Sequence, residues 1–596
     1  MHLVVYGKES LDKTQILVEN KFLKIRNIDR CCPSFPGQPC TSEHLQILVK
    51  AVPIKQGHKL NIIWPITPSI RHYKEGPSRY LSHLIGHEGE GSVFFVLKTL
   101  GWATSLSAGE ADWNFDFSFF HVFIDLTDAG HEHVEDIVAL LFKYIRLLQQ
   151  SGACKWIFDE LAAICETAFH YQDKISPLGY VVNVALNMQL YPPKDWLVRS
   201  SLPSKFNPDL IQSVLNELTP NHVRIFWDST KFEGNTNMTE PWYGTAYSVE
   251  RISDSMIQQW IETAPNENLH LPAPNVFIPT DLSLKNVLEK AKFPLLLRKS
   301  SYSRLWYKPD KTFSTPKAYV KIDFNCPYAG NSPEAEVLVD IFTRLLMDYL
   351  NEYAYYAEVA GLYYWISDTD NGFQVTVVGY NHKLKILLET VVEKIAKFEV
   401  KADRFSVIKE MVTKEYQNFK FQQPFKQAMT FLECYVAGNI EPNEAESMIE
   451  HIEDVFYKGP QPISLALFPS QHFTNRVVKL ERGLSYLYPA EGLNPNDENS
   501  AILHYIQVHQ DDFMLNVRLQ LFALIAKQPA FHQLRSVEQL GYITSLKRRN
   551  DSGIHGLQFI IQSTVKVYKI DLFIAKALSP PLKHFLELDR VLNILI

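Results

Sequence analysis

The feature that most constrains the fold of this chain is a stretch of sequence that recurs three times along its 596 residues. In each copy a glycine follows a helix-like segment and opens a strand rich in aromatic and β-branched residues, and a second such strand comes next. The glycine-centred stretches are T-L-G-W-A-T-S-L around Gly101, V-A-G-L-Y-Y-W-I around Gly361 and Q-L-G-Y-I-T-S-L around Gly541. This recurrence indicates one folding unit that is used repeatedly.

The segments on either side of these hairpins repeat as well. A further strand candidate precedes each copy, at residues 60–65, 319–324 and 502–508. An amphipathic helix follows the first two hairpins, at residues 134–148 and 383–398, with leucine and isoleucine at helical spacing. We therefore predict an α+β fold of tandem homologous modules, each a mostly antiparallel sheet with helices packed on one face.

The two ends of the chain depart from this layout. V-V-Y-G at 4–7 predicts a strand and residues 11–22 predict a short helix, which together resemble the end of a module. In the third copy, Pro580 and Pro581 fall where the helix after the hairpin is due, and proline stops a helix.

Clusters of proline and asparagine indicate linkers between the modules. The predicted division is a C-terminal remnant of a first module at 1–26, a linker at 27–45, a second module at 46–250, a linker at 251–282, a third module at 283–475 and a truncated fourth module at 476–596.

Composition and charge exclude several classes of protein. Apolar residues make up 46% of the chain and charged residues 21%, as in a protein with several hydrophobic cores. The net charge of -7 is spread without long runs, so nothing indicates nucleic acid as a partner. The seven cysteines form no C-x-x-C pair, which favours a reducing compartment. No apolar run reaches the roughly 18 residues that a membrane span needs, so we expect a soluble protein. We expect it inside the cell, with the cytoplasm as the first candidate compartment.

One stretch has the spacing of a metal site. In S-H-L-I-G-H-E-G-E-G at 82–91, His83 and His87 stand four residues apart, and this spacing puts both on one helix face, as in zinc peptidases. The spacing alone leaves a metal site and a pair of structural histidines open.

Longer strings resemble the insulin-degrading enzyme branch of the pitrilysin family of zinc metallopeptidases. H-L-I-G-H-E-G-E-G-S (83–92) is similar to the second domain of that family, L-N-E-Y-A-Y-Y-A-E-V-A-G-L (350–362) to its third, and L-R-S-V-E-Q-L-G-Y (534–542) to its fourth. Together with W-Y-G-T (242–245), these strings keep the order and spacing of the family from residue 1 to about 563. The remaining residues do not resemble it.

The resemblance implies four homologous domains in two halves that enclose a chamber, where peptides are held and cut. In the family, zinc sits in the first domain on H-x-x-E-H, whose glutamate is the general base. This sequence contains neither H-x-x-E-H nor H-E-x-x-H. The resemblance therefore implies a zinc metalloendopeptidase homologue that carries the peptide-binding parts and is inactive alone. The alternative is a non-catalytic peptide-binding or assembly subunit, and whether the chain is an enzyme stays open.

The resemblance also bears on the histidine pair. It places these histidines on the helix that carries H-x-x-E-H in the first domain of the family, with Gly86 where the basic glutamate would stand. On a helix, the side chain of Glu88 points about 100° away from that of His87 and does not replace the missing carboxylate. The resemblance also implies a third ligand on the later helix-like segment 156–169, where Glu160 and Glu166 are available, but neither falls clearly at the expected position. We therefore favour a structural or peptide-binding role for His83 and His87 over a metal site. No metal ligand and no cofactor are expected in this chain, although the full-length family binds zinc.

By resemblance, this region holds the amino-terminal end of a peptide substrate. Its glycines let a second backbone approach closely, and the strand edge at 106–109 lets a peptide extend the sheet. Ala108 stands where the family has a further glycine. The substrate-binding residues predicted in this way are His83, Gly86, His87, Gly89, Leu106 and Gly109.

The resemblance assigns an auxiliary catalytic role to Arg535 and Tyr542. From the residues alone, the first is a solvated helix charge and the second a half-buried strand residue. In the family, the tyrosine hydroxyl donates to the oxyanion that builds up on the attacked carbonyl, and the arginine binds a substrate carbonyl or steadies the tyrosine. The expected partners are peptide substrates and either a second copy or a chain that supplies the catalytic domain, with no nucleic acid and no membrane. Some members of the branch are peroxisomal, which adds a second candidate compartment.

Overall fold

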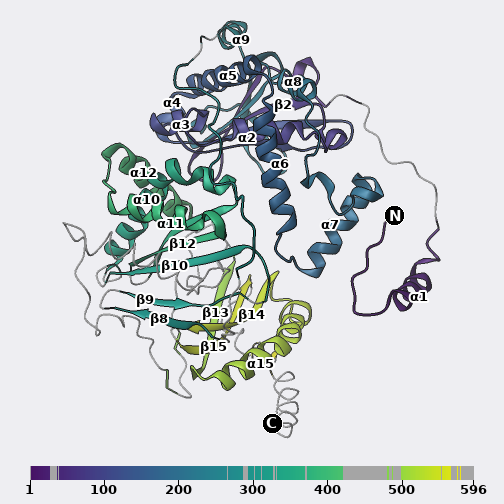
Figure 1. Cartoon of the computed structure of the whole chain (residues 1–596), viewed down its shortest axis with the longest axis vertical. Coiled ribbons are helices and arrows are strands. Elements are labelled where there is room, and N and C mark those ends of the chain that lie inside the picture. Colours follow the sequence, from purple (N-terminus) through teal and green to yellow (C-terminus); the bar gives the residue numbers. More distant parts are fainter. Residues whose placement is uncertain are drawn as a thin grey trace. The chain divides into compact units, whose positions relative to one another are not determined.

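The computed structural model describes residues 2–26, 37, 39–262, 264, 266–285, 293–300, 303–310, 312–326, 329, 332–369, 372–419, 480–481, 486–487, 499–551, 553–564, 574 and 577–578. The chain divides into two units. Figure 1 labels the helices and strands along the chain. One unit contains every described residue up to Met411, and the other contains those from Val412 onward. The predicted module boundaries remain predictions, because the two units do not test them.

The largest sheet of the first unit has seven strands in the order β3-β4-β2-β5-β1-β7-β6. All its pairings are antiparallel except that of β1 with β5. The strands are β1 (Ile47–Ala51), β2 (His58–Ile66), β3 (Ala103–Ala111), β4 (Ser118–Leu126), β5 (Arg224–Ser229), β6 (Met238–Thr239) and β7 (Ala246–Arg251). Along β2, the side chains of Leu60, Ile62 and Trp64 are fully buried and alternate with residues on the other face, as a half-covered strand requires.

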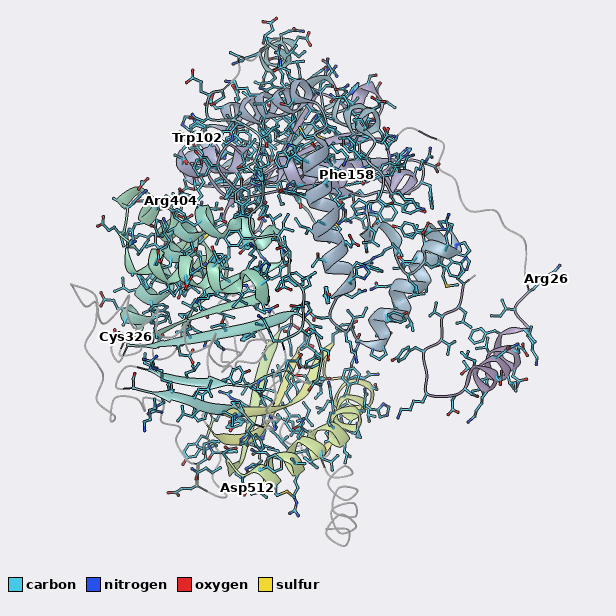
Figure 2. The ribbon with its side chains drawn as sticks, in the orientation of Figure 1. Arg26, Trp102, Phe158, Cys326, Arg404 and Asp512 are labelled. Carbon is cyan, nitrogen blue, oxygen red and sulfur yellow. The ribbon has the colours of Figure 1, made fainter. Side chains whose placement is uncertain are left out.

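Helices pack against the buried face of this sheet and share one hydrophobic core with it. They are α2 (Pro77–Ile85), α3 (Val93–Thr99), α5 (Val134–Ser151), α6 (Lys155–His170), α8 (Pro208–Leu215) and α9 (Asp254–Ile261). The short helix α4 (Asp128–Glu132) and the helix α7 (Pro177–Leu190) contribute no residue to this core, and on α7 only Asn187 is buried. The predicted helix after the first hairpin is confirmed as α5, which ends at Gly152 in a positive φ of 69°. Phe158, on α6 and labelled in Figure 2, packs on Phe206 with ring centroids 5.4 Å apart.

The third module repeats the arrangement of an antiparallel sheet covered by helices, with fewer strands in its sheet. Its sheet has the order β10-β12-β11 and is antiparallel throughout. The elements are β10 (Lys317–Asn325), α10 (Pro333–Val359), β11 (Leu362–Thr369), β12 (Gly372–Tyr380), α11 (Asn381–Ala396) and α12 (Ala402–Phe419), preceded by a hairpin of β8 (Leu295–Lys299) and β9 (Arg304–Tyr307). Its core lies between this sheet and α10 and α11.

The second unit contains the last repeat. Its sheet has the order β13-β15-β14 and consists of β13 (Ser500–Gln510), β14 (Ile543–Asp551) and β15 (Ile554–Ser563). The helix α15 (Phe513–Phe531) continues into a π-helical turn, His532–Val537. The order of these strands matches β10-β12-β11 and, in the first sheet, β2-β4-β3. The predicted repetition of an α+β module, with hairpins opened at Gly101, Gly361 and Gly541, is therefore confirmed.

One local prediction is wrong. The helix predicted at residues 11–22 is present as α1 (Leu11–Phe22), but V-V-Y-G at 4–7 forms no strand. A strand needs a neighbour to pair with, and none of the described strands lies beside this segment. Its tyrosine Tyr6 instead packs on Tyr180 of α7. Pro580 and Pro581 lie outside the described residues. Within the described part of the chain, no helix has the length and hydropathy to cross a membrane.

Candidate peptide-binding site and histidine pocket

A short glycine-rich connection joins α2 to α3. Helix α2 ends at Gly86, and Ser92 begins α3 by accepting a hydrogen bond from the Phe95 backbone N–H at 3.1 Å. Gly91 has a φ of 83°, and a Cβ placed there would overlap the ring of His270. A Cβ at Gly86 would lie 2.8 Å from the backbone oxygen of Ser82. Glycine is therefore required here by backbone conformation and close packing together.

The histidine pair is uncharged because little water reaches it. The rings of His83 and His87 lie 5.6 Å apart at 89° to one another. Burial lowers the pKa of His83 to about 4, and burial together with the neighbouring His83 lowers the pKa of His87 to about 3. The Gly89 backbone N–H donates to Nδ1 of His87 at 3.0 Å, which fixes the orientation of that ring. Both imidazoles are therefore neutral at physiological pH.

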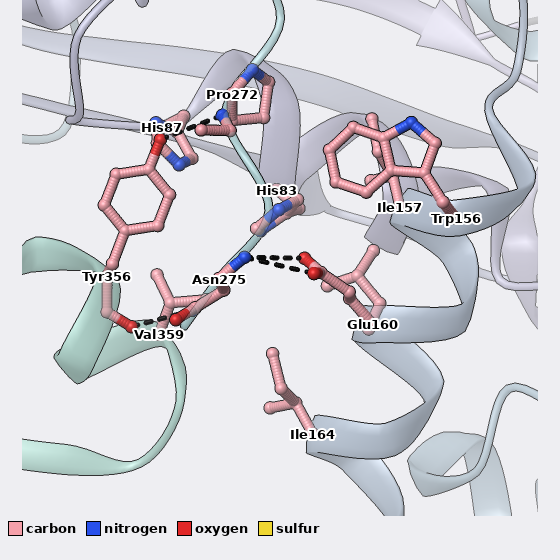
Figure 3. A pocket seen from close by; sticks show the side chains of 12 residues that line it. His83, His87, Trp156, Ile157, Glu160, Ile164, Pro272, Asn275, Tyr356 and Val359 are labelled. Atoms are coloured by element: carbon pink, nitrogen blue, oxygen red, sulfur yellow. Dashed lines mark hydrogen bonds between the residues drawn. The ribbon is translucent and has the colours of Figure 1, made fainter. Parts of the chain in front are cut away.

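The histidine pair lines a small pocket (Figure 3). Its volume is about 10 Å³, close to the space that one water molecule needs. Glu160 of α6 also lines it, and its carboxylate accepts hydrogen bonds from the Asn275 backbone N–H at 3.0 and 3.4 Å. Asn275 in turn donates through Nδ2 to the backbone oxygen of Tyr356 at 2.8 Å. The pocket is too small for a peptide side chain of any length.

These side chains do not fit a zinc ion with an activated water. Across the described residues, no group of three histidine, cysteine, aspartate or glutamate side chains is placed to hold a metal. The Glu160 carboxylate is engaged by Asn275, and Glu166 is exposed on α6, 3.9 Å from His170. Glu88 accepts a hydrogen bond from Asn351 at 2.8 Å. Among the residues that the structure describes, the pair therefore has neither a third ligand nor a carboxylate poised to take a proton.

The long helix α10 of the third module covers this region. The hydroxyl of Tyr355 donates to the backbone oxygen of Gly86 at 3.4 Å. The ring of His87 packs edge-on against Tyr355 and Tyr356, with centroids 4.8 and 5.2 Å apart. In this conformation His87 is 2% exposed. The predicted substrate-binding residues His83, Gly86, His87 and Gly89 thus lie together where the second and third modules meet.

The remaining predicted substrate-binding residues lie on β3. This strand is at the edge of its sheet and pairs only with β4 among the described strands. Leu106 is 3% exposed and faces the core, whereas the side chains of Ser105 and Ser107 are exposed. A Cβ at Gly109 would lie 3.6 Å from Oγ of Ser82, so α2 runs close to this end of the strand. The edge offers unpaired backbone groups, which an extended peptide could join.

Arg535 and Tyr542 lie together in the second unit. The Arg535 guanidinium lies 4.1 Å from the ring centroid of Tyr542 and 5.1 Å from that of Phe531. These distances are those of cation–π contacts, which hold the tyrosine ring against the π-helical turn. Tyr542 precedes β14 and is 82% exposed, so the view of this residue as a half-buried strand residue is wrong. A Cβ at the preceding Gly541 would overlap the backbone oxygen of Gln562, so glycine is required where the chain enters this strand.

Sequence reasoning missed the residues of α10 and the inter-module segment that cover the histidines. Asn351, Tyr355 and Tyr356 lie inside the string 350–362 that carries the resemblance, but nothing in their spacing distinguishes them from core residues of an amphipathic helix. Asn275 falls in the predicted linker. Only the three-dimensional pairing of the modules shows what they contact.

Two family models and several curated proteins match the sequence of this chain. Residues 1–165 and 420–579 match the model described as the peptidase M16 inactive domain, and residues 169–446 match that of the middle or third domain of peptidase M16. Insulin-degrading enzyme-like 1, peroxisomal, from Arabidopsis thaliana is 65% identical over 95% of this chain and 62% of its own length. The human insulin-degrading enzyme is 36% identical over 94% of this chain and 59% of its own.

The fold is also that of a solved structure. The crystal structure of pitrilysin superposes with a TM-score of 0.60 at 21% identity, covering 96% of this chain and 64% of that one. The chain thus spans about three fifths of the length of the curated relatives it matches. From these matches and the repeated module, the chain belongs to the M16 peptidase family, in the branch of the insulin-degrading enzymes.

Proposed function

We propose that this chain is the peptide-binding part of a zinc metalloendopeptidase of the insulin-degrading type, and that it does not hydrolyse peptides by itself. The observation that carries the proposal is the juxtaposition of the open β3 edge with the glycine-rich connection after α2. By resemblance, Gly86 stands where a basic carboxylate would be needed, and the carboxylates of Glu88 and Glu160 are bound to Asn351 and Asn275. These contacts support holding a peptide and do not support activating a water.

In this proposal, the peptide adds to β3 as an extra strand. Backbone hydrogen bonds would supply affinity with little regard to sequence, because every residue except proline carries the same N–H and C=O groups. The buried side chain of Leu106 holds the strand on the core and leaves its edge to the peptide. Such a surface suits a protein that grips many different peptides.

Arg535 and Tyr542 would act on the peptide only beside a zinc-bound water supplied from outside the described residues. The Tyr542 hydroxyl is a donor suited to the oxyanion of the attacked carbonyl, and the guanidinium held over its ring orients it. The exposure of Tyr542 supports this role, because an exposed hydroxyl is free to meet a substrate.

The test is peptide binding and peptide hydrolysis measured on the same preparation. We expect a fluorescently labelled extended peptide to bind by anisotropy and a fluorogenic peptide to stay uncut, with or without a chelator. Ser107→Pro on the edge of β3 should weaken binding about tenfold, the equivalent of one or two lost backbone hydrogen bonds. Thr239→Pro on β6, the opposite edge of the same sheet, is the matched control. Chelator-sensitive cleavage by the wild-type chain would contradict the proposal.

A second candidate function is a non-catalytic assembly subunit. It is favoured by residues 2–26, because α1 buries none of its residues and the side chains of Leu11 and Phe22, which lie on one face of this helix, are 88% and 39% exposed. Such a helix has an apolar face with no partner in the described residues. Sedimentation of the chain alone and mixed with a separately produced domain that carries an H-x-x-E-H motif would decide. Sedimentation unchanged by the mixture would count against this function.

For the compartment, we propose an intracellular location. The printed name of the 65% identical relative includes the word peroxisomal, which makes the peroxisome a candidate beside the cytoplasm. A fluorescent fusion at either end, imaged with a peroxisomal marker, would distinguish the two. Diffuse signal without the marker would leave the cytoplasm, and secretion of the fusion would contradict both.

A further inference from the structure

We propose that α10 of the third module completes the peptide-binding site of the second, with Asn351, Tyr355 and Tyr356 acting as positioning residues for the connection from Gly86 to Gly91. The inference rests on the proposed function and names the device that holds that site in shape. None of the three side chains needs to touch a peptide. They act through the backbone of the connection and through α2.

The first contact is between Asn351 and Glu88. The amide Nδ2 of Asn351 donates to Oε2 of Glu88 at 2.8 Å, and both groups are partly buried. Burial raises the pKa of Glu88, while this hydrogen bond and the charge of Lys98 lower it. A carboxylate that is partly removed from water needs such a partner, because a buried acceptor without one loses its hydrogen bonds to water and gains none in return. Asn351 therefore fixes the conformation of the connection at the residue after His87.

The second contact involves the two tyrosines. Tyr355 donates its hydroxyl to the backbone oxygen of Gly86, and both tyrosine rings close around His87. A Cβ at Gly89 would lie 3.0 Å from Cε2 of Tyr356, so the connection presses directly on this ring. The connection thus accepts a hydrogen bond from α10 at its start and packs on α10 three residues later.

A separate set of charges fixes α10 itself. Asp348 lies on this helix one turn before Asn351. Arg404 of α12 donates to the Asp348 carboxylate at 2.8 and 3.0 Å. From α3, the Nζ of Lys98 lies 3.3 Å from the same carboxylate. One carboxylate of α10 therefore holds two cations from two other helices.

These charges are nearly removed from water. The side chains of Lys98 and Asp348 are each 16% exposed, and that of Arg404, labelled in Figure 2, is 14% exposed. Arg404 also donates to the backbone oxygen of Lys98 at 2.7 Å, and Lys98 donates to that of Asp348. Charge-assisted hydrogen bonds in such surroundings are strong and directional. They fix where α10 lies on α3, so that Asn351 and the tyrosines reach the connection.

The contacts lead from α10 to the edge of the sheet. A Cβ at Gly86 would lie 3.3 Å from the backbone nitrogen of Ala108, so the end of α2 rests on β3. A shift of the connection therefore moves the strand edge to which a peptide would add. Peptide affinity should then depend on residues of the third module that are buried away from the peptide.

The test is Asn351→Asp, assayed by anisotropy with a fluorescently labelled extended peptide on the full chain. At pH 8 the new carboxylate faces that of Glu88, and like charges at this distance repel. We expect affinity to fall about tenfold or more at pH 8, as for a buried charge that has lost its partner. As the pH falls, one of the two acids takes a proton and a hydrogen bond between them becomes available, so affinity should recover.

Other titratable groups also face Glu88. They are Lys98 from α3, Tyr355 and Glu358 from α10, and Tyr364 from β11. All are present in the wild type and in every variant, so the comparison subtracts their contribution. Glu352→Gln changes one charge at the next, exposed position of α10 and serves as the matched control. Asn351→Ala removes the hydrogen bond without adding a charge, so affinity should fall less at pH 8 and recover less at low pH than in Asn351→Asp.

The outcomes separate this inference from the function on which it rests. If the wild type binds no peptide, the proposed function is wrong and the inference falls with it. If the wild type binds the peptide and Asn351→Asp binds it as tightly as the wild type at both pH values, only the inference is overturned. Hydrogen exchange checks that the variants are folded: amides of residues 86–92 should exchange faster, while those of β2 and β4 stay protected. Loss of protection in β2 and β4 would show general unfolding and would also overturn the inference.

Discussion

At the scale of single residues, burial determines the chemistry of the histidine pair. His83 and His87 have the spacing of zinc ligands, yet the folded chain holds them neutral against aromatic rings. A group whose pKa is lower in the folded state than in the unfolded state takes up more protons when the chain unfolds. Acid therefore favours unfolding in the interval between those two values.

This gives a prediction for pH dependence. The unfolded pKa of histidine is near 6.5, and that of folded His87 is about 3. Stability should hold above pH 6.5 and fall below it, by up to about 1.4 kcal/mol per pH unit for each such histidine. His87→Asn retains an acceptor for the Gly89 N–H but cannot be protonated, so it should reduce this slope. Urea denaturation at pH 7.5 and 5 measures the slope, with the exposed His170→Asn as control. Equal slopes in both variants would contradict the prediction.

A second residue-scale prediction concerns Gly91. Its φ of 83° and its contact with His270 both oppose a side chain. Gly91→Ala should destabilise the chain by about 2–4 kcal/mol, the sum of backbone strain and overpacking. Gly234→Ala is the matched control, because that residue has a φ of 78° but nothing within 4 Å. Thermal denaturation gives the difference, which isolates the contact with His270. Equal losses in the two variants would show that packing contributes nothing.

At the scale of elements, the strand orders β2-β4-β3, β10-β12-β11 and β13-β15-β14 are one arrangement repeated. This was predictable from the sequence, because alternation of apolar residues and a glycine at the start of each hairpin are local signals. The failed strand at 4–7 shows the limit of such signals. The composition of residues 4–7 favours a strand, but a strand forms only where a partner strand lies beside it. The sequence of these four residues does not determine whether such a partner is present.

The ion cluster of Asp348 gives an element-scale prediction. Asp348→Ala leaves the cations of Lys98 and Arg404 facing each other with little water, which should cost about 3–5 kcal/mol. Asp159→Ala removes an exposed ion pair with Lys155 and should cost less than about 1 kcal/mol. Urea denaturation followed by tryptophan fluorescence measures both. A cost for Asp348→Ala as small as that of the control would mean that the cluster does not hold α10.

The candidate site was predictable only in part, because some of its residues form a local sequence signal and others do not. The histidines and glycines of 82–91 are adjacent in sequence, so their motif can be recognised within one short string. Asn351 and Tyr355 lie more than 250 residues away, at separations of 263 and 269 from their partners. Contacts of that range follow from how two modules pack, and a single sequence contains no local sign of them.

At the scale of the whole molecule, the chain covers about three fifths of its curated relatives, and its first described helix is not part of any core. Because α1 buries none of its residues, removal of residues 2–26 should leave the melting temperature within about 2 °C of the full chain. Differential scanning calorimetry of the two forms measures this. A larger decrease would mean that the ring contact of Tyr6 with Tyr180 contributes to stability.

The repeated strand order has one more consequence. In each module, the strand that the glycine opens lies at a margin of its sheet: β3, β11 and β14 all have only one neighbour among the described strands. Each module therefore has an edge strand whose outer side pairs with no other described strand, whatever side chains surround it. Binding of an extended chain at such an edge would depend on the strand order of the module and not on the identity of any one side chain.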